Sequence, residues 1–290
     1  MRTILALLAA SAFCQTSIAQ VPSAAAASDA IAEAPAASAA SGASVAAVAP
    51  ATSPLTANTL YMCEFKSNSQ LFKVNPNNGQ ASVVGLMQTS ERCTDLAFRK
   101  TTAAGTELFG TSFTRAFKID PTTGKATLLP NTYGSGIADI NALVAQPGSG
   151  KLFGAGSKAP GKFVDINPVT GKATVKGSYG TGLGSAGDLA FLNGQLYGLL
   201  TKRGNGTRTF LAKVSLGSTT FGKASNLLPI RRSINGTLVQ LNDVWGLVAR
   251  NGVLIAAMRG GELLTINAST GIATLKGDNE KLQAGLALSP

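Results

Sequence analysis

The chain has 290 residues, of which 44% are hydrophobic, 6% aromatic and 13% charged, and 33 are glycine. This balance is typical of a glycine-punctuated β-protein and argues against a coiled coil, a helical bundle or a chain that is disordered throughout. The chain has no histidine. That excludes Ser-His-Asp and Cys-His triads, HExxH zinc sites and His-ligated haem.

The first 58 residues differ in composition from the rest. Residues 1–19 combine one Arg, a short apolar run and a small-x-small sequence, Ser17-Ile18-Ala19, and we interpret them as a secretory signal peptide. A lipoprotein signal acylated at Cys14 is the alternative, but Phe13 stands where a small residue is expected. Residues 20–58 are rich in Ala, Ser and Pro and predict a flexible linker. The remaining chain should be exported to the periplasm or the exterior, and no later segment is apolar enough to cross a bilayer.

Two cysteines, Cys63 and Cys93, remain after removal of the signal peptide. An even pair in an exported domain favours a disulfide, with two buried free thiols as the alternative. A catalytic thiol is disfavoured, because no histidine is present to activate it.

Five segments share one pattern, which is strongest in the first, second, third and fifth copies. They cover residues 70–85, 115–130, 162–177, 210–229 and 262–277. Each has an alternating apolar strand, an Asx-Pro-x-x-Gly turn or its variant, and a short returning strand. Two further strand signals precede each hairpin, one of them opened by an Asp in four copies.

Four short strands in every 45–50 residues predict the blades of a β-propeller. The Asp-led strand should be innermost and the returning strand outermost. The first unit lacks an inner strand, and residues 283–288 form an inner strand without the rest of its blade. We therefore predict an all-β, five-bladed propeller over residues 59–290, closed by pairing of the C-terminal strand with the first blade. An open array of four blades is the alternative.

The repeat that is most complete at residues 117–128, FKIDPTTGKATL, resembles repeats of exported bacterial propellers in the quinoprotein-like and YVTN-like groups. The resemblance covers nearly all of residues 59–290 and implies the fold, but it leaves the function open. Quinoprotein dehydrogenases have more blades, regular Trp positions and a quinone. This chain has only Trp245, so we expect no quinone cofactor.

Several side chains are candidates for a site. Asp95, Asp139, Asp188 and Asp243 each precede or open an inner strand and could form a carboxylate ring at the channel mouth, able to hold Ca²⁺ or to act as acid and base. The alternative is that they bind backbone N–H groups. Trp245 is the best candidate for an aromatic that contacts ligand in the channel. The tyrosines Tyr61, Tyr133, Tyr179 and Tyr197 could do the same or fill the space between blades.

The surface is basic. Residues 59–290 contain 24 Lys and Arg against 12 Asp and Glu. The groups that we predict in loops are Arg99, Lys100, Lys202, Arg203, Arg208, Arg231 and Arg232. Such a surface favours anionic partners, although solubility alone also explains it. No nucleic-acid motif accompanies these residues.

The sequence favours an exported, non-enzymatic binding module for an anionic polysaccharide or another envelope component, with no required cofactor. One alternative is a small hydrolase that uses channel carboxylates on a glycan or phosphate ester. A structural protein of the envelope is the other.

Overall fold

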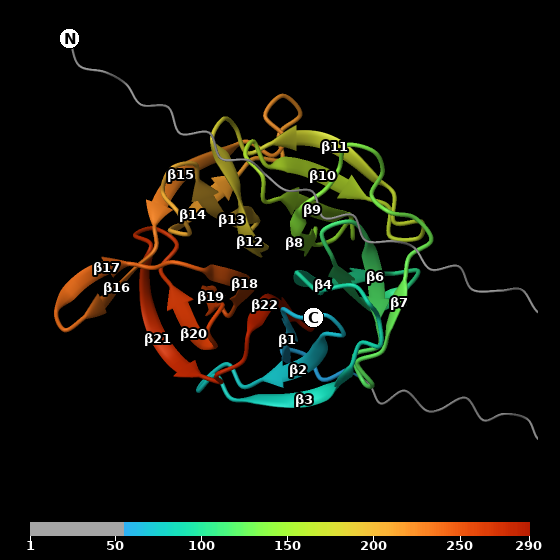
Figure 1. Ribbon diagram of the computed structural model, residues 1–290, viewed down its shortest axis with the longest axis horizontal. Helices are drawn as coiled ribbons and strands as arrows, with labels where there is room; N and C mark the ends of the chain where they lie inside the picture. Colours follow the sequence, from blue (N-terminus) through green and yellow to red (C-terminus); the bar gives the residue numbers. More distant parts are fainter. Residues whose placement is uncertain (1–54) are drawn as a thin grey trace, which may run out of the picture. The chain divides into compact units, whose positions relative to one another are not determined.

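A computed structural model describes residues 55–290, and this range is all-β, with no helix. Five sheets are arranged as blades around a central channel (Figure 1). No helix in this range could cross a membrane. The predicted signal peptide, residues 1–19, and residues 20–54 of the predicted linker lie outside the described residues.

Four blades are formed by consecutive strands, from the innermost to the outermost. Blade 2 contains β4 (Asp95–Thr101), β5 (Gly105–Thr111), β6 (Ala116–Ile119) and β7 (Ala126–Leu128). Blade 3 contains β8 (Ile140–Ala145), β9 (Leu152–Gly156), β10 (Lys162–Ile166) and β11 (Ala173–Ser178). Blade 4 contains β12 (Leu183–Leu192), β13 (Gln195–Lys202), β14 (Thr209–Val214) and β15 (Ala224–Pro229). Blade 5 contains β18 (Val244–Arg250), β19 (Val253–Met258), β20 (Glu262–Ile266) and β21 (Ile272–Asp278).

Blade 1 combines the two ends of the described chain. Its innermost strand is β22 (Gln283–Leu288), followed by β1 (Leu60–Glu64), β2 (Gln70–Val74) and β3 (Ala81–Leu86). Strands β22 and β1 are antiparallel, with Leu60 opposite Leu288 and Met62 opposite Leu286. The predicted five-bladed ring and its closure by the C-terminal strand are therefore confirmed.

The Asx-Pro-x-x-Gly turns join the two outer strands of a blade and also touch the preceding blade. In blade 2, Oδ1 of Asp120 accepts the N–H of Thr122 at 2.8 Å, and Gly124 has φ of 78°. A Cβ at Gly124 would lie 2.8 Å from the carbonyl carbon of Gly85 in β3. Glycine is thus required here both by its positive φ and by the close approach of two backbones.

The hydrophobic core is divided into five clusters, each between two neighbouring blades. Tyr61, Tyr133, Tyr179 and Tyr197 are all buried, and each belongs to a different cluster. These tyrosines therefore fill the space between blades.

The expectation of a disulfide is also confirmed, because Cys63 in β1 is bonded to Cys93, which precedes β4, and the bond links blades 1 and 2.

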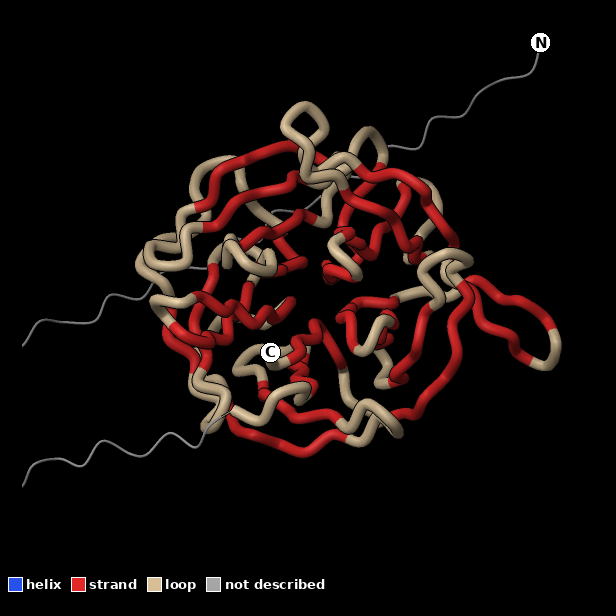
Figure 2. Tube along the Cα trace, turned by 180° about the vertical axis from the view of Figure 1, so that it is seen from behind, coloured by secondary structure: helices blue, strands red, loops and turns tan. Residues whose placement is uncertain are grey.

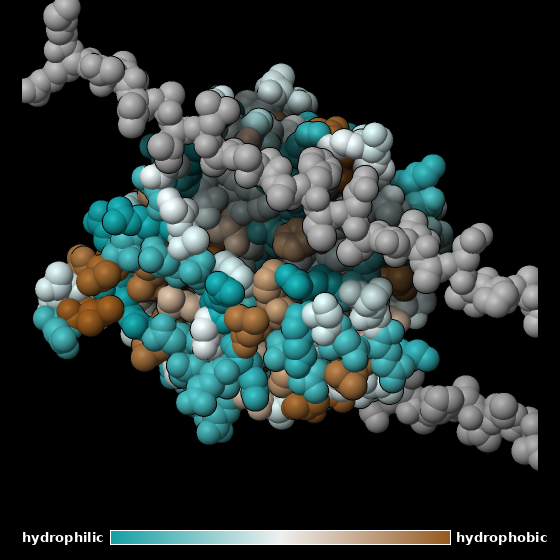
Figure 3. All heavy atoms as spheres, viewed as in Figure 1, coloured by the Kyte–Doolittle hydropathy of each residue, from teal (hydrophilic) through white to brown (hydrophobic). Residues whose placement is uncertain are grey.

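An extra hairpin, which the sequence analysis missed, extends from the connection between blades 4 and 5. It consists of β16 (Arg231–Ile234) and β17 (Thr237–Gln240), and β16 pairs with the outer strand β21 (Figures 1 and 2). Asn235 and Gly236 both have positive φ, as a tight two-residue hairpin turn requires. Its exposed apolar side chains belong to Ile234, Leu238 and Val239, and the hairpin accordingly shows brown patches at the edge of the molecule in Figure 3.

Deletion of residues 283–290 tests ring closure. It removes the partner of β1 together with the buried side chains of Ala284 and Leu286. Losing one large core side chain costs about 2–5 kcal/mol, so loss of the strand should cost more than about 5 kcal/mol and lower Tm by at least about 10 °C. Thermal unfolding measures this. Deletion of the exposed Pro290 alone is the control and should leave Tm unchanged. Closure would be contradicted by an unaltered Tm in the longer deletion.

Candidate ligand pocket at the channel mouth

The strand register places one leucine of each inner strand at the same level of the channel. Leu96, Leu143 and Leu189 pair with Gly110, Gly154 and Gly198, which occupy equivalent positions of their second strands. The complete set of equivalent leucines is Leu96, Leu143, Leu189, Leu247 and Leu286. The residues that immediately precede them are Asp95, Ala142, Asp188, Gly246 and Gly285.

The backbone N–H groups of all five leucines are bound by two carboxyl groups. Asp95 accepts the N–H of Leu96 through Oδ1 at 2.7 Å and that of Leu143 through Oδ2 at 2.6 Å. Asp188 accepts from Leu189 through Oδ1 at 2.6 Å. Its Oδ2 accepts from Leu247 at 2.8 Å and from Leu286 at 3.2 Å. Four carboxyl oxygens thus satisfy one N–H from every blade.

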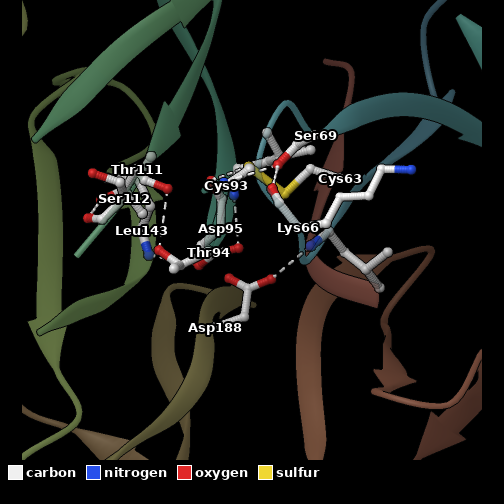
Figure 4. Close-up of a disulfide and its surroundings, with 12 residues drawn as sticks. Cys63, Lys66, Ser69, Cys93, Thr94, Asp95, Thr111, Ser112, Leu143 and Asp188 are labelled. Carbon is white, nitrogen blue, oxygen red and sulfur yellow. Dashed lines mark hydrogen bonds between the residues drawn. A yellow bond between two sulfur atoms is a disulfide. The ribbon is translucent and has the colours of Figure 1, made fainter. Parts of the chain in front are cut away.

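The two glycines at this level have no room for a side chain. A Cβ at Gly285 would lie 1.8 Å from Oδ1 of Asp95, and one at Gly246 would lie 2.7 Å from Cγ of Leu286. The carboxyl groups of Asp95 and Asp188 point toward each other (Figure 4). Together with these glycines, they form a floor across the channel.

Burial raises the pKa of both floor carboxyl groups well above its usual range. The side chains of Asp95 and Asp188 are 0% and 1% exposed, so ionisation of either removes a charge from water. The neighbouring charge of Asp188 raises the pKa of Asp95 further. Hydrogen bonds from backbone N–H groups act in the opposite direction on both groups.

The four aspartates do not form one ring, and this prediction needs correction. Asp139 and Asp243 lie three residues before the level of Asp95 and Asp188, in left-handed turns with φ of 61° and 51°. Asp139 pairs with Lys158 at 2.8 Å, whereas Asp243 lines a cavity at the channel mouth. The prediction treated the four aspartates as equivalent positions of the repeat, but they lie at two different levels of the channel. Among residues 55–290, no three acidic or cysteine side chains are grouped as a metal site, and the Ca²⁺ hypothesis gains no support.

The cavity above the floor has a volume of about 280 Å³. Its lining includes three aromatic side chains, Phe65, Phe113 and Trp245, and the ring centroid of Phe65 lies 5.1 Å from that of Trp245. Trp245, which we predicted to face the channel and contact ligand, lines this cavity. The remaining lining residues are mostly small and polar: Thr94, Asn141, Ser157, Ser185, Ala186, Gly187, Thr201, Thr207 and Asp243. We name this cavity the mouth pocket.

Two exposed arginines lie at the rim of the mouth pocket. The guanidinium of Arg92 lies 4.8 Å from the ring centroid of Phe65, and that of Arg259 lies 5.1 Å from the ring of Trp245. Both arrangements are typical of cation–π contacts. Neither arginine has an ion-pair partner among residues 55–290, so both leave positive charge available to a ligand.

Two acceptors of the mouth pocket have no hydrogen-bond partner among the described residues. Oδ1 of Asn141 is buried and unbonded, while its Nδ2 donates to the carbonyl of Ser185 at 3.3 Å. The carboxylate of Asp243 has no ion-pair partner among residues 55–290 either, but it is only half-buried, so water can solvate it. A buried acceptor without a donor is costly, and a ligand that supplies O–H or N–H groups would remove this cost.

A second cavity, of about 160 Å³, lies on the other side of the floor. It is lined by three consecutive residues of every inner strand, such as Leu96-Ala97-Phe98, and these residues are apolar. The floor therefore separates a mouth lined by aromatic and small polar side chains, whose exposed surface is mostly apolar, from an opposite end lined by the apolar side chains and the backbone of the inner strands. The mouth pocket is closed at its base.

The basic residues that we predicted in loops are mostly in strands, which is a correction. Arg99 and Lys100 lie in β4, Lys202 ends β13, and Arg231 and Arg232 lie in β16. The physical reason is that β4 continues to Thr101 and that an Asn-Gly turn creates the extra hairpin. The charges of two of these basic residues are paired, since Arg99 forms an ion pair with Glu107 and Arg232 with Glu262, each at 2.7 Å. Arg203 lies in the turn after β13, and Arg208 forms a bridge with Asn242.

Sequence reasoning missed Phe65, Phe113, Asn141, Arg92 and Arg259 as residues of the pocket. Asn141 could have been found by aligning the inner strands on their shared leucine, because it then occupies the same position as Trp245. The other four lie in the connections between strands, where the repeat pattern gives no register.

Comparison with known proteins shows only the fold. No family model matches this chain, and no curated protein matches it. A solved structure of an engineered GH43 glycoside hydrolase with endo-xylanase and exo-arabinofuranosidase activity matches with a TM-score of 0.50 and 11% identity. The match covers 75% of this chain and 50% of the hydrolase, so this chain spans half the length of that protein.

Two further solved structures match less closely. One is a glutaminyl cyclase from Myxococcus xanthus, with a TM-score of 0.40, 16% identity and coverage of 68% of this chain and 70% of the cyclase. The other is a Bacteroides thetaiotaomicron protein of unknown function, with a TM-score of 0.45, 11% identity and coverage of 69% and 54%. The fold places this chain among the five-bladed β-propellers.

The floor carboxyl groups predict a specific pH dependence of stability. Because their pKa values are raised on folding, the folded protein retains protons above about pH 4 that the unfolded chain has lost. Their contribution to the unfolding free energy is therefore largest in acid and decreases as the pH rises through the folded-state values. Denaturant unfolding between pH 4 and 9 should show this decrease. Asp188→Asn should reduce the slope of the unfolding free energy against pH. Asp165→Asn, which makes the same substitution in β10, should leave that slope unchanged. Equal slopes in all three proteins would rule out the floor as the source.

Gly285→Ala tests how tightly the floor is packed. The new Cβ would overlap Oδ1 of Asp95 and displace its hydrogen bonds to Leu96 and Leu143. We expect a loss of about 3 kcal/mol in the free energy of unfolding, at the upper end of typical overpacking costs. Gly260→Ala is the control, because a Cβ added there would meet no atom within 4 Å and the φ of Gly260 is not positive. If the Gly285→Ala variant were as stable as the Gly260→Ala variant, the floor would not be tightly packed.

Proposed function

We propose that this protein is an exported binding module that takes an anionic glycan or another anionic envelope component in the mouth pocket. Residues 1–19 would direct export as a signal peptide, and residues 20–58 would connect the propeller to its surroundings as a flexible linker. The resemblance of the repeats to exported bacterial propellers agrees with this assignment. The proposal includes no quinone and no metal cofactor.

The observation that carries the proposal is the pair of rim arginines stacked on pocket aromatics. Arg92 covers the ring of Phe65 and Arg259 that of Trp245, so aromatic surface and positive charge occur at the same opening. Guanidinium groups suit carboxylates or other anions, and the parts of the two rings that the arginines leave uncovered add apolar surface to the pocket. The excess of 12 positive charges over residues 59–290 would attract such a ligand from a distance.

The arrangement of the carboxylates supports binding more than hydrolysis. Glycosidases commonly use two carboxyl groups about 5–10 Å apart, with the reacting bond between them. Here Asp95 and Asp188 face each other, are buried and are occupied by backbone N–H groups. Asp243 is the carboxylate that lines the mouth pocket. The hydrolase and the purely structural role remain the competing hypotheses.

Titration calorimetry with polygalacturonate, and with dextran as the neutral polymer, tests the proposal on the full chain. We expect saturable binding of the acidic polymer that weakens as salt is raised from 50 to about 300 mM. The Arg92→Gln/Arg259→Gln variant should bind at least about tenfold more weakly, because two charge contacts are lost. Lys100→Gln/Lys151→Gln removes the same charge away from the mouth and should bind like the natural protein.

The outcomes separate the three hypotheses. Release of reducing ends from the polymer by the natural protein, lost in Asp243→Asn, would establish the hydrolase instead. Absence of saturable binding to any acidic saccharide would contradict the proposal and favour a structural role. Equal weakening by both double variants would show that charge acts without the mouth pocket.

A further inference from the structure

We propose that the mouth pocket binds the terminal residue of a glycan chain, end-on, and that this residue is a sugar acid whose hydroxyl groups face the floor and whose carboxylate faces the rim arginines. The inference rests on the proposed function and specifies which part of an acidic glycan is bound. Its support comes from the closed base, the polarity of the lower wall and the position of the positive charges.

The closed base prevents a chain from passing through the channel. Asp95 and Asp188 fill the centre of the channel, and their oxygens are bonded to N–H groups of all five inner strands. The pocket above them, at about 280 Å³, lies just below the range of sites that enclose drug-sized ligands. A pocket of this size accommodates roughly one sugar ring, and because the base is closed a chain can enter it with its end but cannot thread through it.

The lower wall consists of groups that accept hydrogen bonds. The hydroxyl of Thr94 already donates to the carbonyl of Thr111 at 3.1 Å, and that of Ser185 donates to the carbonyl of Gly187 at 2.6 Å. Their oxygens can still accept. Oδ1 of Asn141 is buried and unbonded. A complementary ligand must therefore present several donors to this wall, and the adjacent hydroxyl groups of a sugar ring do so.

The rim determines the charge of the ligand. An ammonium group would also satisfy an acceptor-rich wall beside aromatic rings. However, the guanidinium groups of Arg92 and Arg259 lie over Phe65 and Trp245 at the opening and would repel a cation that enters there. A sugar acid meets both conditions when its hydroxyl groups donate to the wall, including the carboxylate of Asp243, and its own carboxylate stays at the rim beside the arginines.

Binding capacity as a function of chain length tests the end-on mode. Polygalacturonate is cleaved to shorter average lengths, and each preparation is titrated against the full-length protein at the same total mass of sugar. End-on binding predicts that the number of bound proteins rises in proportion to the number of chains. Free galacturonic acid should compete fully, whereas galactose and galactosamine should compete at least about tenfold more weakly.

Asn141→Leu provides the test at the level of a single residue. It removes the buried acceptor with little change in side-chain volume, so the affinity for galacturonic acid should fall at least about tenfold because a ligand hydroxyl is left unpaired. Asn77→Leu, on the exposed turn between β2 and β3, is the matched control and should retain the natural affinity. The Tm of both variants, measured in parallel, identifies any loss caused by misfolding.

The failures of the two proposals are distinguishable. If capacity follows total mass and the monosaccharide does not compete, the protein binds internal segments, so end-on binding is wrong while the proposed function stands. If galactosamine competes better than galacturonic acid, the pocket takes a cation and the assignment of a sugar acid is wrong. If no acidic saccharide binds at any length, the proposed function itself fails. Unchanged affinity in a folded Asn141→Leu variant would place the ligand elsewhere.

Discussion

The structure depends on the pairing of five backbone N–H groups with two carboxyl groups at the centre of the ring. The innermost strand of each propeller blade has a free edge toward the channel, and a buried N–H left unpaired there costs about 1–3 kcal/mol. Asp95 and Asp188 remove this cost for all five blades. They lie in blades 2 and 4, so each carboxyl group reaches its own blade and at least one other. The hydrogen bonds thus connect strands that do not belong to the same sheet.

This pairing also breaks the symmetry of the repeats. Five equivalent positions are occupied by two aspartates, one alanine and two glycines, because a third large side chain would not fit. The two aspartates also close the channel, so that its two ends have different linings. Apolar residues from every inner strand line one end, whereas aromatic and small polar side chains from strands and connections line the other. The two ends of the channel therefore differ in their lining, even though the blades are similar.

Much of the fold could be predicted from the sequence because strand period, turn residues and repeat length are local properties. The Asx-Pro-x-x-Gly turns predicted the outer hairpins. The incomplete first blade from residue 60 and the isolated strand from residue 283 predicted how the ring closes. The site could be predicted only in part. Trp245 was predicted to face the channel, and it lines the mouth pocket. Asp139 and Asp243 were placed at the wrong level, since the offset of three residues depends on pairing between strands. Arg92 and Phe65 are brought together by tertiary contact, for which the sequence carries no periodic signal. The hairpin at Asn235-Gly236 did have a local signal, which the repeat pattern obscured.

Closure by the C-terminal strand has a consequence for the order of events during biosynthesis. Blades 2 to 5 are each made of neighbouring sequence and can assemble as the chain emerges. Blade 1 cannot be completed until Leu288 has left the ribosome, and the N–H of Leu286 reaches Asp188 only then. Until that moment β1 has an open edge and the central carboxyl groups lack one of their donors. The last strand to emerge is therefore the one that completes the ring.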